Sequence, residues 1–291
     1  MTGEARAFVK GHGTENDFIV LLDEDGHLDL SPSLVAALCD RRSGLGADGV
    51  LRAVRAGAID EGAGYEPDAW FMDLRNADGS SAEMSGNGIR VFAAFLARDL
   101  GVDFGEGVGI ATRAGLKAVT ATGGGRYSVG MGRYSIPGGG QSDVTVTVEG
   151  VGERPAVGVD MGNPHAVAAV DESELGLADL TVPPRVSPEP KGGVNVELVA
   201  VVDADQGGRR AIRMRVFERG VGETRSCGTG ACASAVAARA WEGESGSRDW
   251  EVHVPGGTLV VDVEDDGVTL TGPAILVADG MVDLTSLLPA S

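Results

Sequence analysis

Two segments of the sequence place a small nucleophilic residue before a Gly-x-Gly turn. In EMSGNGIR, residues 83–90, this residue is Ser85, and in RSCGTGAC, residues 225–232, it is Cys227. An apolar run follows each turn, so each Gly-x-Gly is expected to open a helix. Helix N-termini offer backbone N–H groups and a partial positive charge, which suits a carboxylate. The same field is expected to lower the pKa of Cys227 below its usual value of about 8.5.

Acid/base groups on opposite faces of one carbon are what the racemisation of an α-carbon requires. One group removes the α-proton and the other delivers a proton to the far face. The carbanion also needs its carboxylate held in a positive field, which paired helix starts would supply. Ser85 and Cys227 are the candidates for the two groups. The alternative interpretation of Cys227 is an ordinary buried cysteine.

The elements that must position these residues are a few helices among many strands. Residues 89–97 are apolar nearly all round except for Arg90, and residues 231–238 are small and apolar. A helix without a polar face must be surrounded by protein. Alternating Val, Thr and Ile elsewhere predict mostly antiparallel strands, with a meander turning at residues 255–257 and 265–267. Another helix is expected from Ser31-Pro32 to about Arg42.

The two halves of the chain correspond. The interval from Ser85 to Cys227 equals that from Asn76 to Glu218, and Asn16 and Asn163 each precede an apolar run. This indicates duplication of a whole domain, because solenoid repeats have much shorter periods. The predicted fold is therefore α+β, with two pseudo-symmetric domains. Their expected ranges are 1–132 plus 275–291 and 133–274, with the active site in the cleft between them.

Composition excludes several classes of function. The chain has 291 residues, of which 43% are hydrophobic, and a net charge of −19. This charge argues against nucleic-acid binding, which needs a basic face. No apolar run is long enough to span a membrane, and the N-terminus lacks an apolar signal region. The spacing of Cys39, Cys227 and Cys232 matches no zinc pattern. We expect a cytoplasmic protein without metal or cofactor.

Four motifs, NADGSSAEMSGNGIR, MGNPH, GVNVE and ERGVGETRSCGTGAC, occur in an order that resembles the diaminopimelate epimerase family. The resemblance extends over nearly the whole chain. It implies an isomerase of lysine biosynthesis that works without pyridoxal phosphate (PLP), usually as a homodimer, and that interconverts LL- and meso-diaminopimelate by two-base proton transfer. It also implies two mirror-related domains, each a mostly antiparallel, barrel-like sheet around a central helix.

The resemblance assigns roles to individual residues. Cys227 matches one catalytic cysteine, Ser85 occupies the place of the other, and His165 and Glu218 match the residues that assist proton exchange. A set of polar side chains is implied to hold the substrate's distal amino and carboxylate groups: Asn16, Asn76, Asn163, Asn195 and Arg219. Glu218 is implied to contact the substrate as well. Backbone groups at the two helix starts are implied to hold the reacting carboxylate: Gly86, Asn87, Gly228 and Thr229.

Two positions depart from the family pattern. Gly49 stands where many members have Gln, so one substrate contact is missing or replaced. Ser85 is the larger departure, because a hydroxyl is a far weaker acid than a thiol and needs strong activation to act as a base. We therefore expect low activity with binding retained. Two alternatives stay open: a racemase or epimerase of another amino acid, and a substrate-binding but catalytically silent variant.

Overall fold

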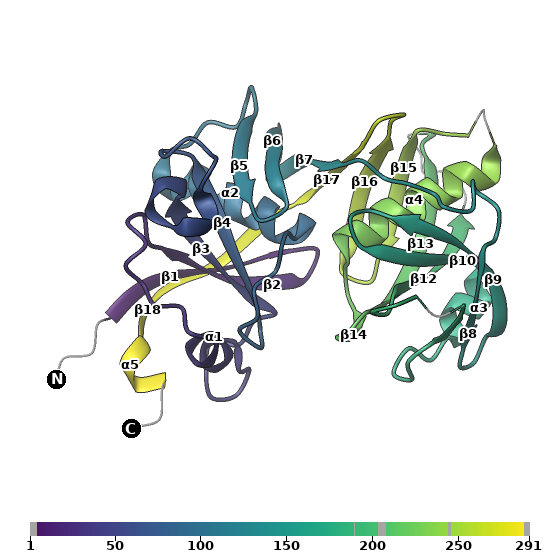
Figure 1. The fold of residues 1–291 in the computed structure, drawn as a ribbon, viewed down its shortest axis with the longest axis horizontal. Coiled ribbons are helices and arrows are strands. Elements are labelled where there is room, and N and C mark those ends of the chain that lie inside the picture. Colours follow the sequence, from purple (N-terminus) through teal and green to yellow (C-terminus); the bar gives the residue numbers. More distant parts are fainter. Residues whose placement is uncertain (1–4, 189, 203–207, 244–245, 288–291) are drawn as a thin grey trace. The chain divides into compact units, whose positions relative to one another are not determined.

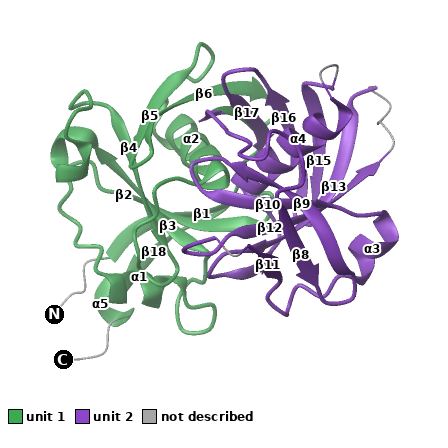
Figure 2. Cartoon of the chain, turned by 45° about the vertical axis from the view of Figure 1, so that its right-hand side comes forward, with its two compact units in different colours: residues 1–129, 273–291 green, residues 130–272 purple. Residues whose placement is uncertain are grey.

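The computed structural model describes residues 5–188, 190–202, 208–243 and 246–287, and the chain forms two compact units (Figures 1 and 2). Unit 1 comprises Met1–Val129 and Pro273–Ser291, and unit 2 comprises Gly130–Gly272. The chain passes from unit 1 to unit 2 within β7 (Arg126–Gly132) and returns at the end of β17 (Val268–Pro273). The predicted boundaries, 132/133 and 274/275, lie close to these two points.

Strands make up most of both units. The other strands of unit 1 are β1 (Ala5–Gly13), β2 (Asn16–Leu22), β3 (Gly49–Arg55), β4 (Trp70–Asn76), β5 (Val108–Thr112), β6 (Gly115–Gly123) and β18 (Ile275–Asp283). Those of unit 2 are β8 (Val144–Val148), β9 (Gly152–Asp160), β10 (Pro164–Ala169), β11 (Arg185–Ser187), β12 (Asn195–Val202), β13 (Arg210–Glu218), β14 (Gly222–Thr224), β15 (Asp249–Val254) and β16 (Gly257–Val263).

Strand pairing repeats from one unit to the other. In unit 1, β1–β2 is antiparallel, β2–β3 parallel, β3–β4 antiparallel, β4–β5 parallel, and β5–β6–β7 antiparallel. In unit 2, the strands β9, β10, β12, β13, β15, β16 and β17 follow the same order of antiparallel and parallel pairs. The predicted duplication is thus confirmed at the level of topology. Antiparallel pairs dominate as predicted, and the parallel pairs were not foreseen.

One buried helix lies within each unit, as predicted. In unit 1, α2 (Gly86–Leu100) is buried from Gly86 to Leu96 and contacts β1, β2, β3, β4 and β18. In unit 2, α4 (Gly228–Glu242) is buried over most of its first three turns and contacts β9, β10, β12, β13, β15 and β16. Each helix starts directly after the residue singled out in the sequence, so Ser85 and Cys227 are both N-caps.

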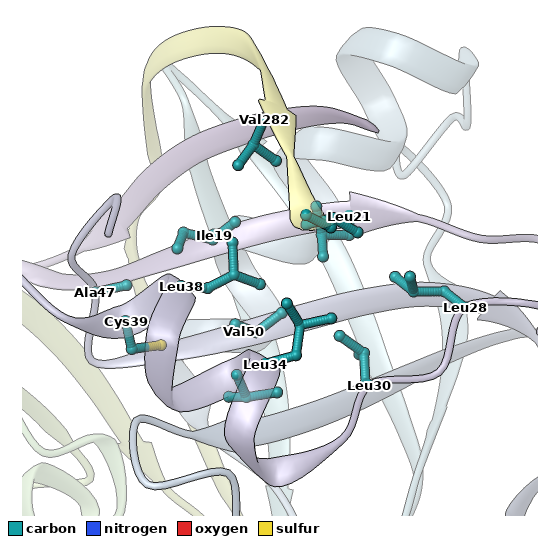
Figure 3. Close-up of a cluster of buried hydrophobic side chains, with 12 residues drawn as sticks. Ile19, Leu21, Leu28, Leu30, Leu34, Leu38, Cys39, Ala47, Val50 and Val282 are labelled. Atoms are coloured by element: carbon teal, nitrogen blue, oxygen red, sulfur yellow. The ribbon is translucent and has the colours of Figure 1, made fainter. Parts of the chain in front are cut away.

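A second helix of unit 1, α1 (Pro32–Cys39), packs Leu34 and Leu38 against Ile19 of β2 and Val50 of β3 (Figure 3). These strands are therefore covered by α1 on one face and by α2 on the other. The predicted end of this helix near Arg42 is wrong. The chain turns at Asp40, because its backbone is extended and its carboxylate accepts hydrogen bonds from the N–H groups of the next turn.

The short helix α3 (Glu172–Leu177) was not predicted, although its sequence carries a start signal. Asp171 caps it and Glu174 bonds back to the cap, which forms a capping box. The remaining helices are α5 (Leu284–Leu287) and two 3₁₀ turns, Ala56–Ala58 and Asp60–Gly62. Within the part of the chain that the structure describes, none of the helices has the length and apolarity needed to cross a membrane.

Candidate active site: two half-sites on equivalent helix starts

Half-site 1 comprises Ser85 and the residues around the start of α2. Ser85 has extended backbone angles, and its hydroxyl oxygen accepts a hydrogen bond from the N–H of Gly88 at 3.0 Å. Its carbonyl accepts from the N–H of Ile89. The hydroxyl therefore serves as a helix cap in this structure, which is the commonest role of Ser before a helix.

A polar network connects the first turn of α2 with the turn between β1 and β2. The Nδ2 group of Asn87 donates to Oδ1 of Asn16 at 3.3 Å, and Nδ2 of Asn16 donates to Asp48 at 2.7 Å. The fully buried guanidinium of Arg90 donates to Oδ1 of Asn87 at 2.8 Å. Thr14, which adopts a left-handed backbone with φ of 49°, donates to the same oxygen. Asn16 and Asn87 are thus held in one geometry.

Asn76 ends β4 and is exposed at the edge of half-site 1. Its Nδ2 group donates to the hydroxyl of Ser80 at 3.0 Å. Gly49 starts β3 and lies opposite Asn76 in the sheet register. A Cβ added to Gly49 would lie 2.5 Å from the carbonyl oxygen of Arg75. A longer residue at position 49 would therefore require a backbone shift, so the strand geometry here is adapted to glycine.

Half-site 2 comprises Cys227 and the residues around the start of α4. The Cys227 sulfur accepts from the N–H of Gly230 at 3.3 Å and lies 3.5 Å from the hydroxyl of Thr229. Only 7% of the residue is exposed. The position therefore matches that of Ser85, with a thiol in place of the hydroxyl.

The expected low pKa of Cys227 is contradicted. Burial raises the pKa of this thiol well above its ordinary value, and the carboxylates of Glu218 and Glu197 raise it further. The hydrogen bonds from Thr229 and Gly230 oppose these effects without cancelling them. The helix field was the only influence considered from the sequence, and desolvation by a buried site outweighs it. Cys227 is therefore a thiol, the form that can give up a proton.

Glu218 ends β13 beside this thiol. Burial raises the pKa of its carboxyl group, while hydrogen bonds from Thr224 and Cys227 lower it and the charge of Glu197 raises it again. The net direction is upward, so this carboxylate binds a proton more readily than an exposed glutamate. Thiol and carboxylate thus form a pair that can share one proton, with burial raising the proton affinity of both.

His165 lies on β10 with a fully buried side chain. Its Nδ1 atom is 2.7 Å from Oε1 of Glu197, and its Nε2 atom is 3.1 Å from Oδ1 of Asn163. Asn163 in turn donates to the hydroxyl of Thr229 at 3.4 Å. A continuous network therefore runs from Glu197 through His165 and Asn163 to the first turn of α4.

Asn195 and Arg219 lie on the adjoining strands. Asn195 starts β12, donates to the carbonyl of Pro164 at 3.1 Å, and accepts from the backbone N–H of Arg219 at 3.0 Å. The guanidinium of Arg219 is exposed and donates to the carbonyl of Gly192 at 3.1 Å. Arg219 thus places a positive charge at the margin of half-site 2.

Register equivalence shows how the two half-sites differ. Phe18 of β2 pairs with Gly49 of β3, and at the equivalent place in unit 2 His165 of β10 pairs with Asn195 of β12. Leu51 and Glu197 each follow two residues later on these strands, so they are equivalent as well. A Cβ on Gly88 would meet Ser85, Phe18 and Leu51 at 3.2–3.4 Å. A Cβ on the equivalent Gly230 would meet Glu197 and Cys227, at 2.7 and 3.3 Å. Aromatic and aliphatic groups in half-site 1 are thus replaced by ionisable groups in half-site 2.

Each predicted site residue falls in one of the two half-sites. Half-site 1 contains Asn16, Asn76, Ser85, Gly86 and Asn87, and half-site 2 contains Asn163, His165, Asn195, Glu218, Arg219, Cys227, Gly228 and Thr229. Glu197 was missed. The signal for it was present, because it is a single acidic residue in the otherwise apolar run VELVAVV and shares a strand face with Asn195. In the described ranges, no group of three His, Cys, Asp or Glu residues is placed to hold a metal ion.

Comparison with known proteins identifies a family that the chain matches over nearly its whole length. The family model described as diaminopimelate epimerase matches residues 8–137 and 157–277. The chain is 51% identical to the diaminopimelate epimerase of Streptomyces coelicolor, over 95% of each chain. It is 46% identical to that of Corynebacterium glutamicum, over 95% of this chain and 98% of the relative.

Solved structures with the same fold are more distant in sequence. A predicted epimerase from Pseudomonas aeruginosa superposes with a TM-score of 0.66 at 18% identity, covering 95% of this chain and 99% of the other. This similarity establishes the fold: two domains of mostly antiparallel sheet, each around a central helix.

Proposed function

Because this chain belongs to the diaminopimelate epimerase family, we propose that it interconverts LL- and meso-diaminopimelate by proton transfer at the α-carbon, without PLP. Family membership makes it an isomerase, and the proposal adds this substrate and this mechanism. The observation that carries the proposal is the pair of equivalent helix caps, Ser85 and Cys227, each at the start of a buried helix. We further propose that both half-sites act on one substrate molecule.

The backbone N–H groups at the two helix starts are proposed to bind the carboxylate next to the reacting carbon. These groups belong to Gly86, Asn87, Gly228 and Thr229. Two helix N-termini would place positive potential on this carboxylate, where negative charge grows as the α-proton leaves. The distal amino and carboxylate groups are proposed to be held by the side chains of Asn16, Asn76, Asn163, Asn195 and Arg219, and Glu218 is proposed to contact the substrate as well. Arg219 suits a carboxylate because its guanidinium can form two parallel hydrogen bonds.

Cys227 is proposed to exchange a proton with one face of the α-carbon. When Glu218 takes the thiol proton through the hydrogen bond between the two groups, the thiolate can remove the α-proton from one face. The thiol so formed can return a proton to the carbanion on the same face, and Glu218 gives its own proton to water. His165 is proposed to assist this exchange. The raised pKa values of Cys227 and Glu218 support the assignment, since a thiol that holds its proton can deliver it and a carboxylate with raised proton affinity can take it up.

Ser85 is proposed to leave the opposite face nearly without a catalyst. A hydroxyl becomes a base only with strong activation by a neighbouring base. The side chains that lie nearest to the start of α2 at the equivalent positions are Phe18 and Leu51, and neither can accept a proton. We therefore expect substrate binding with slow inversion in this sequence.

Proton NMR in heavy water would test the function directly, with LL- and meso-diaminopimelate supplied separately. The expected result is exchange of the α-proton from one diastereomer with little inversion, because Cys227 serves only one face. Exchange with rapid inversion would support diaminopimelate as the substrate but would contradict the proposed role of Ser85.

Absence of both exchange and inversion would have a different meaning. Together with tight binding by calorimetry, it would indicate a catalytically silent variant. Without binding, it would favour a racemase or epimerase of another amino acid, and a panel of amino acids would then be tested by the same exchange measurement.

Association into a homodimer is a further part of the proposal. β18 carries exposed apolar side chains at alternating positions, with Ile275, Val277 and Met281 exposed by 47%, 55% and 64%. A stripe of this kind on one strand face favours contact with a second protein surface. Light scattering coupled to size-exclusion chromatography should give twice the chain mass, and Val277→Asp should reduce it to one chain. We also propose that the enzyme works in the cytoplasm, which cell fractionation would test.

A further inference from the structure

Half-site 2 contains a glutamate whose burial needs an explanation. Glu197 is fully buried, with 0% of the residue exposed. Its Oε1 atom is 2.7 Å from Nδ1 of His165, and its Oε2 atom has no hydrogen-bond partner among the described residues. Burial of an incompletely paired carboxylate is unfavourable, because the charge loses its hydration and gains too few hydrogen bonds in exchange. Buried ionisable groups of this kind are concentrated at functional sites, so Glu197 is a candidate for a functional role.

Packing of the fold does not require a carboxylate at this position. The equivalent residue in unit 1 is Leu51, which lies next to Gly88 in the first turn of α2 as Glu197 lies next to Gly230 in that of α4. The same strand pairing and the same helix start are therefore compatible with an aliphatic side chain. His165 and Glu197 replace Phe18 and Leu51 together, so the two ionisable residues form a matched pair.

The short contact fixes how His165 carries its proton. A carboxylate oxygen only accepts, so Nδ1 of His165 must donate to it. Nε2 is then the nitrogen on the side of Asn163 and the helix start, at 3.1 Å from the amide of Asn163. If the side-chain oxygen of Asn163 faces the ring, Nε2 of His165 donates to it and both ring nitrogens carry a proton. If the Asn163 amide is flipped, its NH₂ group donates to Nε2 instead. Nδ1 carries a proton in both arrangements.

The charge of Glu197 also acts on the proton-sharing pair beside it. It raises the pKa of the Cys227 thiol, after burial and Glu218, and it raises the pKa of Glu218, after burial. The charged groups that act on Cys227 are Glu218 and Glu197, and His165 acts on Glu218. Removal of one negative charge from this group should therefore make the thiol easier to ionise.

We propose that Glu197 is a positioning residue that fixes the Nδ1–H form of His165 and, through its negative charge, keeps the exchangeable proton on Cys227. The proposal deepens the proposed function and rests on half-site 2 being the acid/base site. It predicts two separable effects of Glu197, one on the histidine tautomer and one on the thiol.

Two variants separate these effects. Glu197→Gln removes the charge and keeps an oxygen that can accept from Nδ1–H. Glu197→Leu removes both, and it installs the residue that unit 1 carries at the equivalent position. Glu251→Gln is the matched control, because Glu251 also lies beside a histidine of unit 2, with 3.2 Å between its carboxylate and Nε2 of His253.

The thiol is measured by alkylation with iodoacetamide as a function of pH, with peptide mapping to quantify Cys227 separately from Cys39 and Cys232. In Glu197→Gln and Glu197→Leu, the midpoint of the Cys227 profile should fall by about one pH unit, the usual effect of a nearby charge. Glu251→Gln should leave the profile where it is. Equal midpoints in Glu197→Gln and the unchanged protein would overturn the proposal.

The tautomer is measured by ¹⁵N NMR of the histidine rings, with the His165 signals assigned by their loss in His165→Gln. Glu197→Gln should keep the Nδ1–H signal, and Glu197→Leu should shift the ring toward the Nε2–H form. Retention of the Nδ1–H form in Glu197→Leu would overturn the tautomer part. If Glu197→Leu does not fold, the thiol result with Glu197→Gln decides the proposal.

Neither measurement needs a substrate, so failure of this proposal is distinguishable from failure of the assignment to diaminopimelate. Where α-proton exchange is observed, Glu197→Leu should lower its rate about 10–100-fold, the loss seen when the carboxylate that orients a metal-bound histidine is removed. Rescue to within a few-fold by Glu197→Gln would assign the loss to the tautomer, and an equal loss in both variants would assign it to the charge.

Discussion

Beneath the first turn of α2 lie Phe18 and Leu51, and at the equivalent positions beneath α4 lie His165 and Glu197. Both helices have 15 residues and are capped at the equivalent position, and the order of parallel and antiparallel strand pairs is the same in the two units. One copy of a duplicated scaffold has therefore packed this space with apolar side chains, and the other has placed ionisable groups there. Comparison of the copies separates what the fold requires from what the chemistry requires, which a single domain cannot do.

The two helix caps also show a structural role shared by both units and a chemical role found in one. Ser85 and Cys227 both accept a hydrogen bond from the N–H three residues later, so either side chain satisfies the helix start. Cys227 is in addition close to Glu218 and Glu197, whose charges raise its proton affinity. The structural role is shared, and the acid/base role is concentrated in unit 2.

Removal of the thiol should have the largest effect. In Cys227→Ala, α-proton exchange should fall by at least about 10³-fold, because the only strong acid/base candidate at the helix caps is lost. Ser85→Ala is the matched variant, with the same loss of a cap and an expected change below about tenfold. Both rates are measured by NMR in heavy water. Equal losses in the two variants would show that the half-sites contribute equally.

Restoration of a thiol in half-site 1 should give the next largest effect. In Ser85→Cys, inversion should rise by about 10²–10⁴-fold, the range that a positioned acid/base group contributes. Binding should change little, which calorimetry with diaminopimelate would check. A gain in exchange without a gain in inversion would mean that the added thiol serves the same face as Cys227.

The sequence predicted the buried helices, their start residues and the duplication, because apolar periodicity and Gly-x-Gly spacing are local signals. It did not predict the end of α1, which depends on how Asp40 turns the chain. It also gave the wrong direction for the pKa of Cys227. Helix position can be inferred from neighbours in sequence, whereas desolvation and the charges of Glu197 and Glu218 depend on residues brought together by folding.

Replacement of the glycine in the first turn of each buried helix should lower the exchange rate moderately, and more in unit 2 than in unit 1. In Gly230→Ala, the new Cβ would lie 2.7 Å from Oε1 of Glu197, so the carboxylate must move and exchange should fall about 10–100-fold. In Gly88→Ala, the nearest atoms lie at 3.2–3.4 Å, and the effect on exchange should be only a few-fold. Melting temperatures of both variants control for folding. A larger loss of exchange in Gly88→Ala would contradict the assignment of chemistry to unit 2.

Alkaline stability should show the smallest effect. The pKa of Cys227 is raised in the folded state, so its contribution to stability is fully present below the unfolded pKa of about 8.5 and is lost as pH rises above it. The free energy of unfolding should fall with pH by up to about 1.4 kcal/mol per pH unit for this one proton.

Denaturant unfolding between pH 7 and 10 measures this slope. Burial also raises the pKa of Cys39 to about 11. Its contribution to the fall of stability at alkaline pH is the same in every variant, so it cancels when two variants are compared. In Cys227→Ser, the free energy of unfolding should fall less steeply between pH 7 and 10 than in the unchanged protein, because a hydroxyl does not ionise in this range. Ser85→Ala should leave this dependence on pH as it is, since half-site 1 has no ionisable cap. An equal dependence on pH in Cys227→Ser would mean that the thiol ionises equally in the folded and unfolded chains. The neighbouring carboxylates Glu197 and Glu218 would then not hold its proton.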